Sequence, residues 1–233
     1  MGHLAHPARA RPEKKSPAGG DRVAGPALRV AARARCARRA TNGWTGRRAW
    51  GYDRGDLRMK IRLVSPAERF RAGFLGALGE FQREGLAWWI GGDLELAERD
   101  FAAFVAKKLA DAEPRAEGVV AKTHLWAIAG ARFVGRISIH HALSDALRIS
   151  GGHIGYDTVP SLRGRGVASE MLRQALPVAR GLGLREVLLT CDDTNVGSIR
   201  VIERNGGVLR ETRALAADRP HKRYYWIGLG GES

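Results

Sequence analysis

The chain has 233 residues, of which 44% are hydrophobic, and a formal net charge of +15 at pH 7. No part of it approaches the ~18 consecutive apolar residues of a membrane-spanning helix, and two cysteines, Cys36 and Cys191, are too few for a disulfide framework. We therefore expect a cytoplasmic globular protein that does not enter a membrane.

The positive charge is concentrated in residues 1–58. This segment holds 14 Lys and Arg residues against four Asp and Glu residues, and so carries +10 of the net charge. It is rich in Ala, Arg, Gly and Pro, and it cannot bury enough apolar surface to offset its ordering entropy. We predict a disordered basic tail over residues 1–58 and a folded domain over 59–233. The favoured interpretation is that the tail is translated from sequence upstream of the true start codon and that the native protein starts at Met59. The alternative is a nucleic-acid-binding arm.

An edge strand followed by two helices is predicted at the start of the domain. Residues 59–64 alternate between apolar and polar side chains, which is typical of an edge strand. Ser65 is placed to cap a helix that has Pro66 at its first position. The apolar face of this helix carries Phe70, Phe74, Leu78 and Phe81. A second helix is predicted over residues 94–110, with Ala97, Phe101, Val105 and Leu109 directed inward.

Strands dominate the middle of the domain. Residues 123–143 predict two strands around a tight turn at Gly130-Ala131. Residues 144–150 predict a short helix or loop, and residues 151–160 predict another strand, which Pro160 closes.

The last third of the chain alternates helices and strands. A helix is predicted over residues 167–182, because apolar residues recur there on one face. Residues 185–192 predict a buried strand, and Asn195 is placed to cap a short helix that ends at Asn205-Gly206. Residues 206–212 and 222–229 predict the final strands. The whole order predicts an α/β fold with a mixed, mostly antiparallel central sheet and helices on both faces.

A basic, glycine-rich turn precedes the helix that begins at residue 167. The first amides of a helix have no partner within it and carry partial positive charge. Glycines let a ligand approach the backbone closely, and Arg163 and Arg165 add positive charge. This combination suits a pyrophosphate. A plain left-handed turn with solvated arginines is the alternative.

Two familiar phosphate motifs fit the turn poorly. The P-loop pattern G-x-x-x-x-G-K-[ST] does not occur in the chain. The dinucleotide pattern G-x-G-x-x-G lacks its third glycine, because Ser169 stands there, and residues 161–163 separate the turn from the preceding strand.

A third pattern fits better. Residues 163–168, Arg-Gly-Arg-Gly-Val-Ala, match [Q/R]-x-x-G-x-[G/A], which resembles the coenzyme A pyrophosphate turn of the GNAT superfamily of N-acetyltransferases. Residues 154–161 resemble the fourth strand of that superfamily. Residues 195–209 resemble its segment N-x-x-S/A-x-x-x-x-E-x-x-G. The resemblance covers about residues 59–233 in order and is strongest over 152–209.

The resemblance implies acetyl-CoA as cosubstrate and no metal. It implies that amides from Arg165 to Ser169 bind the pyrophosphate and that the backbone of Thr158 and Val159 pairs with pantetheine. It further implies that the amide of Asp157 or Thr158 polarises the thioester carbonyl. The coenzyme-binding residues implied in this way are Asp157, Thr158, Val159, Arg163, Gly164, Arg165, Gly166, Val167, Ala168, Ser169, Asn195 and Ser198.

The chain departs from the superfamily pattern at one catalytic position. Many members carry a tyrosine just before the Glu of the last helix, where it protonates the leaving thiolate, and this chain has Ile202 there. His153 is a candidate for the base that accepts the amine proton, and Tyr225 is a candidate acid. The pair His140-His141 is not predicted to bind a metal, because adjacent strand residues point to opposite faces.

The favoured hypothesis is an enzyme that moves the acetyl group of acetyl-CoA to an amine of a small molecule or peptide by direct attack in a ternary complex. The resemblance implies that residues 66–110 and about 212–222 shape the acceptor site, where Phe81, Trp88 and Trp89 could wall an apolar pocket. A coenzyme-A-binding protein without catalysis and a nucleic-acid-binding protein are the alternatives. A homodimer is left open.

Overall fold

A computed structural model of the chain describes residues 60–85, 93–113 and 118–230. The predicted basic tail, Cys36, Trp88 and Trp89 lie outside these described residues. The elements in chain order are β1 (Ile61–Val64), η1 (Glu68–Phe70), α1 (Arg71–Arg83), α2 (Leu94–Arg99), α3 (Phe101–Ala110), β2 (Lys122–Ala129), β3 (Arg132–His140), α4 (Asp145–Ile149), β4 (Ile154–Thr158), η3 (Pro160–Leu162), α5 (Val167–Gly181), β5 (Glu186–Asp192), α6 (Val196–Arg204), β6 (Val208–Arg213) and β7 (Lys222–Gly228).

The strands form two antiparallel sheets. The first has the order β1-β2-β3-β4 and the second the order β5-β7-β6. Between them an isolated bridge joins Gly152 to Leu189. The predicted α/β fold with mostly antiparallel pairing is therefore confirmed, and the structure adds that the sheet is divided between β4 and β5.

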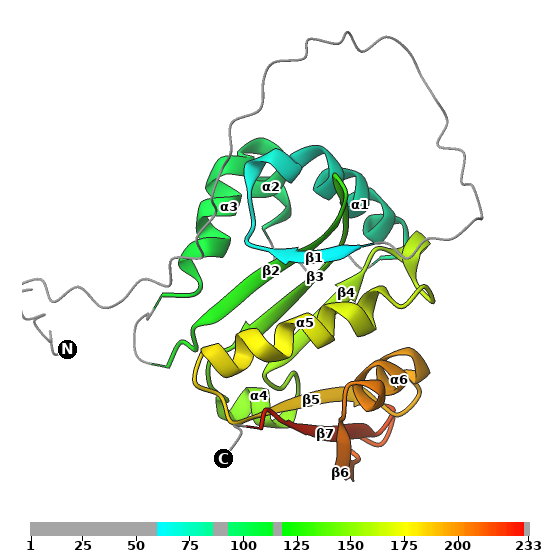
Figure 1. Cartoon of the computed structure of the whole chain (residues 1–233). Helices are drawn as coiled ribbons and strands as arrows, with labels where there is room; N and C mark the ends of the chain where they lie inside the picture. The colour runs from blue at the N-terminus through cyan, green and yellow to red at the C-terminus, as the bar shows by residue number, and fades with distance from the viewer. Residues whose placement is uncertain (1–59, 86–92, 114–117, 231–233) are drawn as a thin grey trace, which may run out of the picture. The chain divides into compact units, whose positions relative to one another are not determined.

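Helices cover both faces of the first sheet. Figure 1 shows α1, α2 and α3 on one face and α5 on the other, while α6 lies beside β5. Among the described residues, none of the helices combines the length and the apolar character needed to cross a membrane.

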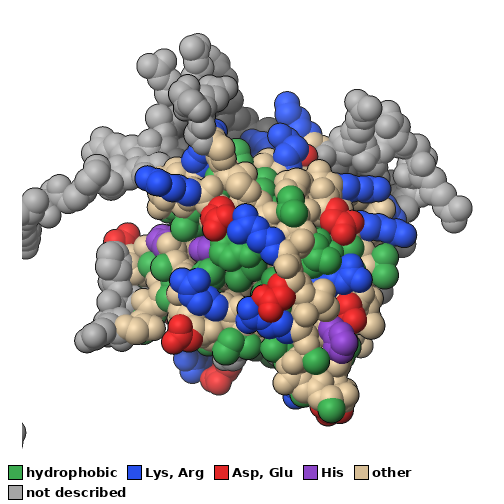
Figure 2. All heavy atoms as spheres, turned by 90° about the horizontal axis from the view of Figure 1, so that it is seen from below, with side chains coloured by type: hydrophobic (Ala, Val, Ile, Leu, Met, Phe, Trp, Pro, Cys, Tyr) green, Lys and Arg blue, Asp and Glu red, His purple; other side chains and the backbone are tan. Residues whose placement is uncertain are grey.

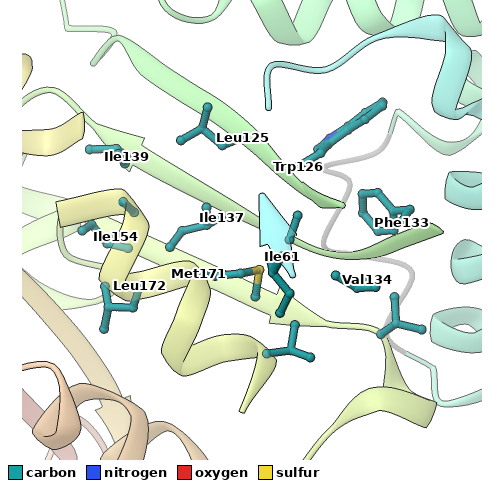
Figure 3. Close-up of a cluster of buried hydrophobic side chains, with 14 of the residues drawn as sticks. Ile61, Leu125, Trp126, Phe133, Val134, Ile137, Ile139, Ile154, Met171 and Leu172 are labelled. Carbon is teal, nitrogen blue, oxygen red and sulfur yellow. The ribbon is translucent and has the colours of Figure 1, made fainter. Parts of the chain in front are cut away.

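The core fills both sides of the first sheet. Met171 and Leu172 of α5 lie on the same side as Ile137 and Ile154 (Figure 3). On the opposite side Trp126 stacks on Phe74 of α1 with ring centroids 5.0 Å apart, within a cluster that also contains Phe101, Phe104 and Phe133. Burial of large aromatic rings supplies much of the driving force that holds a helix on a sheet.

Two local predictions about the first helices were wrong. Ser65 does not cap a helix, because a 3₁₀ turn comes first at Glu68 and α1 begins only at Arg71. The helix predicted over 94–110 is broken at Asp100, whose carboxylate accepts a hydrogen bond from the Ala103 amide at 2.9 Å and caps α3. Ala97, Phe101 and Val105 are buried as predicted on both sides of the break, whereas Leu109 is 45% exposed.

Candidate functional site

The glycine turn ends in a left-handed residue at the start of α5. Gly164 and Gly166 have φ angles of 75° and 79°, and Gly166 is the N-cap of the helix. A Cβ at either glycine would meet nothing within 4 Å. The glycines are therefore needed for their backbone conformation, and the space beside them is open to a ligand. The amides of Val167, Ala168 and Ser169 are the first of the helix and have no partner within it.

Two acidic side chains at the C-terminal end of α1, Glu80 within the helix and its C-cap Glu84, contact the segment that leads into this turn. Arg163 Nη1 lies 2.7 Å from Glu84 Oε2, and the Ser161 amide donates to Glu80 Oε2 at 3.0 Å. Arg163 was predicted to lie near a pyrophosphate. In the structure its guanidinium is directed to Glu84, and its part in binding a pyrophosphate stays a prediction.

The two sheets are joined at the beginning of β4. The His153 amide donates to Leu188 O at 2.7 Å, and the Leu188 amide donates to His153 Nδ1 at 2.8 Å. The Gly151 amide donates to Thr190 Oγ1 at 2.9 Å. These hydrogen bonds connect the two sheets over only a few residues.

Beyond this joint a cavity of about 200 Å³ opens between β4 and β5. One wall comes from β4, one from β5, and a third from α6. The residues that line it are Gly151, Ile154, Gly155, Tyr156, Leu189, Thr190, Ser198 and Ile202.

The hydrogen-bonding phase of β4 decides which backbone groups face this opening. The His140 amide donates to His153 O, and the Val159 amide donates to Val134 O. In an antiparallel pair hydrogen-bonded residues alternate with residues that point away, so Gly155 and Asp157 also bond toward β3. Tyr156 and Thr158 therefore direct their amides and carbonyls away from β3, on the side of the opening, and of the two Tyr156 lines the cavity.

The alternation along β4 divides the residues whose backbone was expected to contact the coenzyme into two groups. The Asp157 amide and both backbone groups of Val159 are directed into the protein, since Val159 O accepts from the Leu162 amide at 2.8 Å. Of the two amides considered for the thioester carbonyl, that of Thr158 faces the opening. The buried Thr158 Oγ1 has no hydrogen-bond partner among the described residues, and Thr158 is not among the residues that line the cavity.

The helix α6 contributes in two different ways. Asn195 Oδ1 accepts from the Ser198 amide at 3.0 Å, so Asn195 caps the helix as predicted. Ser198 lines the cavity, whereas Asn195 is not among its lining residues.

The two predicted catalytic side chains, His153 and Tyr225, do not line the cavity. His153 accepts the Leu188 amide, and burial, together with the charge of Arg148, lowers its pKa. Tyr225 is fully buried, its hydroxyl donates to Glu203 Oε1 at 3.1 Å, and burial raises its pKa. These partners indicate structural roles, and the catalytic roles stay predictions.

Tyr156 is the ionisable cavity residue that sequence reasoning missed. Its hydroxyl donates to Ser198 O at 3.4 Å across the opening, and burial raises its pKa to about 12. The signal was the strand period: Tyr156 has the phase of Thr158, which the resemblance had already placed at the site.

A second polar group lies on the other face of β4. Arg136 Nη2 lies 2.7 Å from Asp157 Oδ2, and burial lowers the pKa of Arg136. On the same face of the sheet His124 Nε2 lies 2.9 Å from Asp111 Oδ2, and burial lowers the pKa of His124 to about 4. The face that carries α1 to α3 therefore holds two polar contacts, and none of their four residues lines the cavity.

Comparison with known proteins identifies the family of this domain. Residues 58–208 match the acetyltransferase (GNAT) domain family. Solved structures with the same fold include RimJ of Mycobacterium smegmatis in complex with CoA-disulfide, at 18% identity and a TM-score of 0.53 over 72% of this chain and 81% of that one. A GNAT-family acetyltransferase of Streptococcus pneumoniae follows at 16% identity and 0.51 over 73% and 100%.

The microcin C7 self-immunity acetyltransferase MccE, in complex with acetyl-CoA and AMP, shares 14% identity at a TM-score of 0.51 over 72% of this chain and 92% of its own. At these identities the likeness shows the fold. None of the curated proteins matches the chain.

Proposed function

Because the chain belongs to the acetyltransferase (GNAT) family, whose members are acetyl-CoA-dependent N-acetyltransferases, we propose that it transfers the acetyl group directly to an amine of a small molecule or peptide in a ternary complex. The observation that carries the proposal is the opening between β4 and β5, with outward-facing backbone groups on one wall and the glycine turn of α5 just beyond it. We place the activity in the cytoplasm.

The coenzyme would occupy two connected parts of the site. Its pyrophosphate would take the amides of Val167, Ala168 and Ser169, where the helix N-terminus is positive. Its pantetheine would run along β4 as an added strand and bond the backbone of Tyr156 and Thr158. The cavity of about 200 Å³ is smaller than the ~300–1,000 Å³ of whole-ligand pockets. It therefore suits the thioester end of the coenzyme rather than all of it.

The reaction follows from this placement. A neutral amine forms a bond to the acetyl carbon, and the Thr158 amide donates to the oxyanion that develops on the carbonyl. The carbon–sulfur bond then breaks, the sulfur leaves with the electron pair, and the amine proton passes to a base or to water. Holding both reactants in one site supplies a large part of the rate.

The two alternative functions predict different results. A coenzyme-A-binding protein without catalysis is favoured by Ile202, which lines the cavity in place of the superfamily tyrosine. A nucleic-acid-binding protein would depend on the arm before Met59. In Figure 2 Lys and Arg side chains are interspersed with Asp and Glu, so this face lacks the continuous basic surface that phosphate backbones require.

The test is calorimetry of the full chain with coenzyme A and acetyl-CoA, followed by a thiol-release assay with amines, aminoglycosides, amino acids and peptide N-termini. Binding together with amine-dependent thiol release supports the proposal. Binding without release from any amine supports the non-catalytic alternative. Failure to bind coenzyme A contradicts both.

A further inference from the structure

The cavity between β4 and β5 contains one ionisable side chain among its described lining residues. Tyr156 reaches into it from β4, and the other lining residues are aliphatic, glycine, Thr190 or Ser198. Ile202, at the position where many superfamily members carry a tyrosine, lines the same cavity from α6. The two positions therefore face one space from opposite walls.

Resting on the proposed function, we propose that the Tyr156 hydroxyl donates a hydrogen bond to the departing coenzyme A sulfur, and so provides the stabilisation that Ile202 cannot give. The hydroxyl now donates to Ser198 O at 3.4 Å, which is long for a bond between oxygens. Exchanging so long a bond for one to an anionic sulfur costs little and gains a charge-assisted interaction.

The acidity of the phenol determines whether Tyr156 transfers its proton to the sulfur or only donates a hydrogen bond. An alkyl thiol such as the Cys side chain has a pKa of about 8.5, whereas burial raises the pKa of Tyr156 to about 12. Full transfer of the proton to the thiolate is therefore unfavourable by roughly three powers of ten. Tyr156 keeps its proton and stabilises the sulfur as a donor. The thiolate takes its proton from solvent after release.

This role differs from that of a transferring acid in its pH dependence. A transferring acid whose pKa is matched to the working pH would produce a basic limb in kcat as it titrates. Tyr156 stays protonated up to about its pKa of 12, so it should give kcat no basic limb in the neutral range.

Tyr224 offers a matched control. It is a buried tyrosine, whereas Tyr156 is half-buried, and its hydroxyl likewise donates to a backbone carbonyl, that of Ile149, at 2.7 Å. It is not among the cavity-lining residues. Tyr156→Phe and Tyr224→Phe therefore remove the same atom and the same type of bond, one inside the cavity and one outside it.

The first experiment measures the bound coenzyme itself and needs no acceptor. The ultraviolet absorbance of the thiolate is followed against pH with coenzyme A bound to the full chain. We expect the native protein to hold the thiol pKa below that of free coenzyme A. Tyr156→Phe should raise this pKa by about one to two, and Tyr224→Phe should leave it unchanged.

The second experiment measures turnover. With an accepted amine and saturating acetyl-CoA, Tyr156→Phe should lower kcat by about tenfold to a hundredfold. Its dissociation constant for acetyl-CoA and the shape of its pH profile should be unchanged. Tyr224→Phe should lower the melting temperature and leave kcat near the native value.

Several outcomes overturn the assignment. A native protein that binds coenzyme A without lowering the thiol pKa contradicts it, even if Tyr156→Phe proves unstable, and leaves the proposed acetyl transfer standing. Equal effects of Tyr156→Phe and Tyr224→Phe on kcat would show a structural role only. A native chain that does not bind coenzyme A overturns both proposals.

Discussion

The strand β4 meets β5 at its beginning and separates from it at its end. At the beginning, Gly152 and His153 bond to Leu188 and Leu189 through backbone and imidazole. At the end, Tyr156 and Thr158 keep backbone groups without a strand neighbour. The closed end fixes the angle between the two sheets, and the open end provides the edge on which a ligand can pair. The difference shows how one strand serves both the fold and the site.

The largest expected effect comes from disrupting the closed end of β4, where Gly152 and His153 contact β5. Gly152 has φ of 70°, and a Cβ there would lie 2.4 Å from Leu188 O. Gly152→Ala should therefore lower the free energy of unfolding by about 3 kcal/mol, measured by urea denaturation. Gly155→Ala is the control, because its Cβ would meet only Ser138 Oγ at 3.9 Å. It should change stability by no more than about 1 kcal/mol. Equal losses would show that the closed end is not special.

The second effect is a loss of stability at acidic pH that arises at the closed end of β4. The His140 amide donates to His153 O, and burial, helped by the charge of Lys122, lowers the pKa of His140 from 6.5 to about 4. Between these values the unfolded chain binds a proton and the folded chain does not, so stability falls as the pH decreases from 6.5 toward 4. Because the ring is partly exposed, we expect a loss of about 2 kcal/mol.

The measurement is the free energy of unfolding as a function of pH for the native chain and for His140→Gln. The variant should show a smaller slope over this interval. The buried His153 and His124, whose pKa values burial also lowers, leave a residual slope in the same direction. An unchanged slope in His140→Gln would contradict the assignment.

Much of the fold and part of the site could be predicted from sequence, for local reasons. The Asn195 cap and the left-handed Gly166 are backbone features that short motifs specify directly. The break at Asp100 was missed because apolar spacing continued through it. The partners of His153 and Tyr225, Leu188 and Glu203, could not be predicted because they are 35 and 22 residues away, and the catalytic roles of both side chains stay predictions. The position of Tyr156 in the cavity depends on the separation of the two sheets, which no local pattern records.

The third effect concerns the open end and its glycine turn. Gly166→Glu adds bulk and negative charge where backbone amides would meet the pyrophosphate. The affinity for coenzyme A should fall at least tenfold, about 1.4 kcal/mol, in calorimetry. Gly183→Glu is the control, since Gly183 also has a left-handed φ, 88°, with nothing within 4 Å of its Cβ, and lies beyond the other end of α5. Equal affinity in the two variants would rule out the turn as the pyrophosphate site.

The smallest effect is expected from restoring the tyrosine that many superfamily members carry. Ile202 lines the cavity, so the ring in Ile202→Tyr has space on that side, although Gly207 approaches closely on the other: a Cβ at Gly207 would lie 2.3 Å from Ile202 Cγ2. A new acid in a site without a donor would raise the rate by roughly 10²–10⁴-fold. If Tyr156 already stabilises the sulfur, a second hydroxyl adds little stabilisation, and the kcat of Ile202→Tyr should stay within about threefold of native. Ile202→Phe, which adds the ring without the hydroxyl, corrects for crowding. A rise of tenfold or more in Ile202→Tyr over Ile202→Phe would mean that the native cavity lacks a donor, and Tyr156 would then be a structural link between β4 and α6.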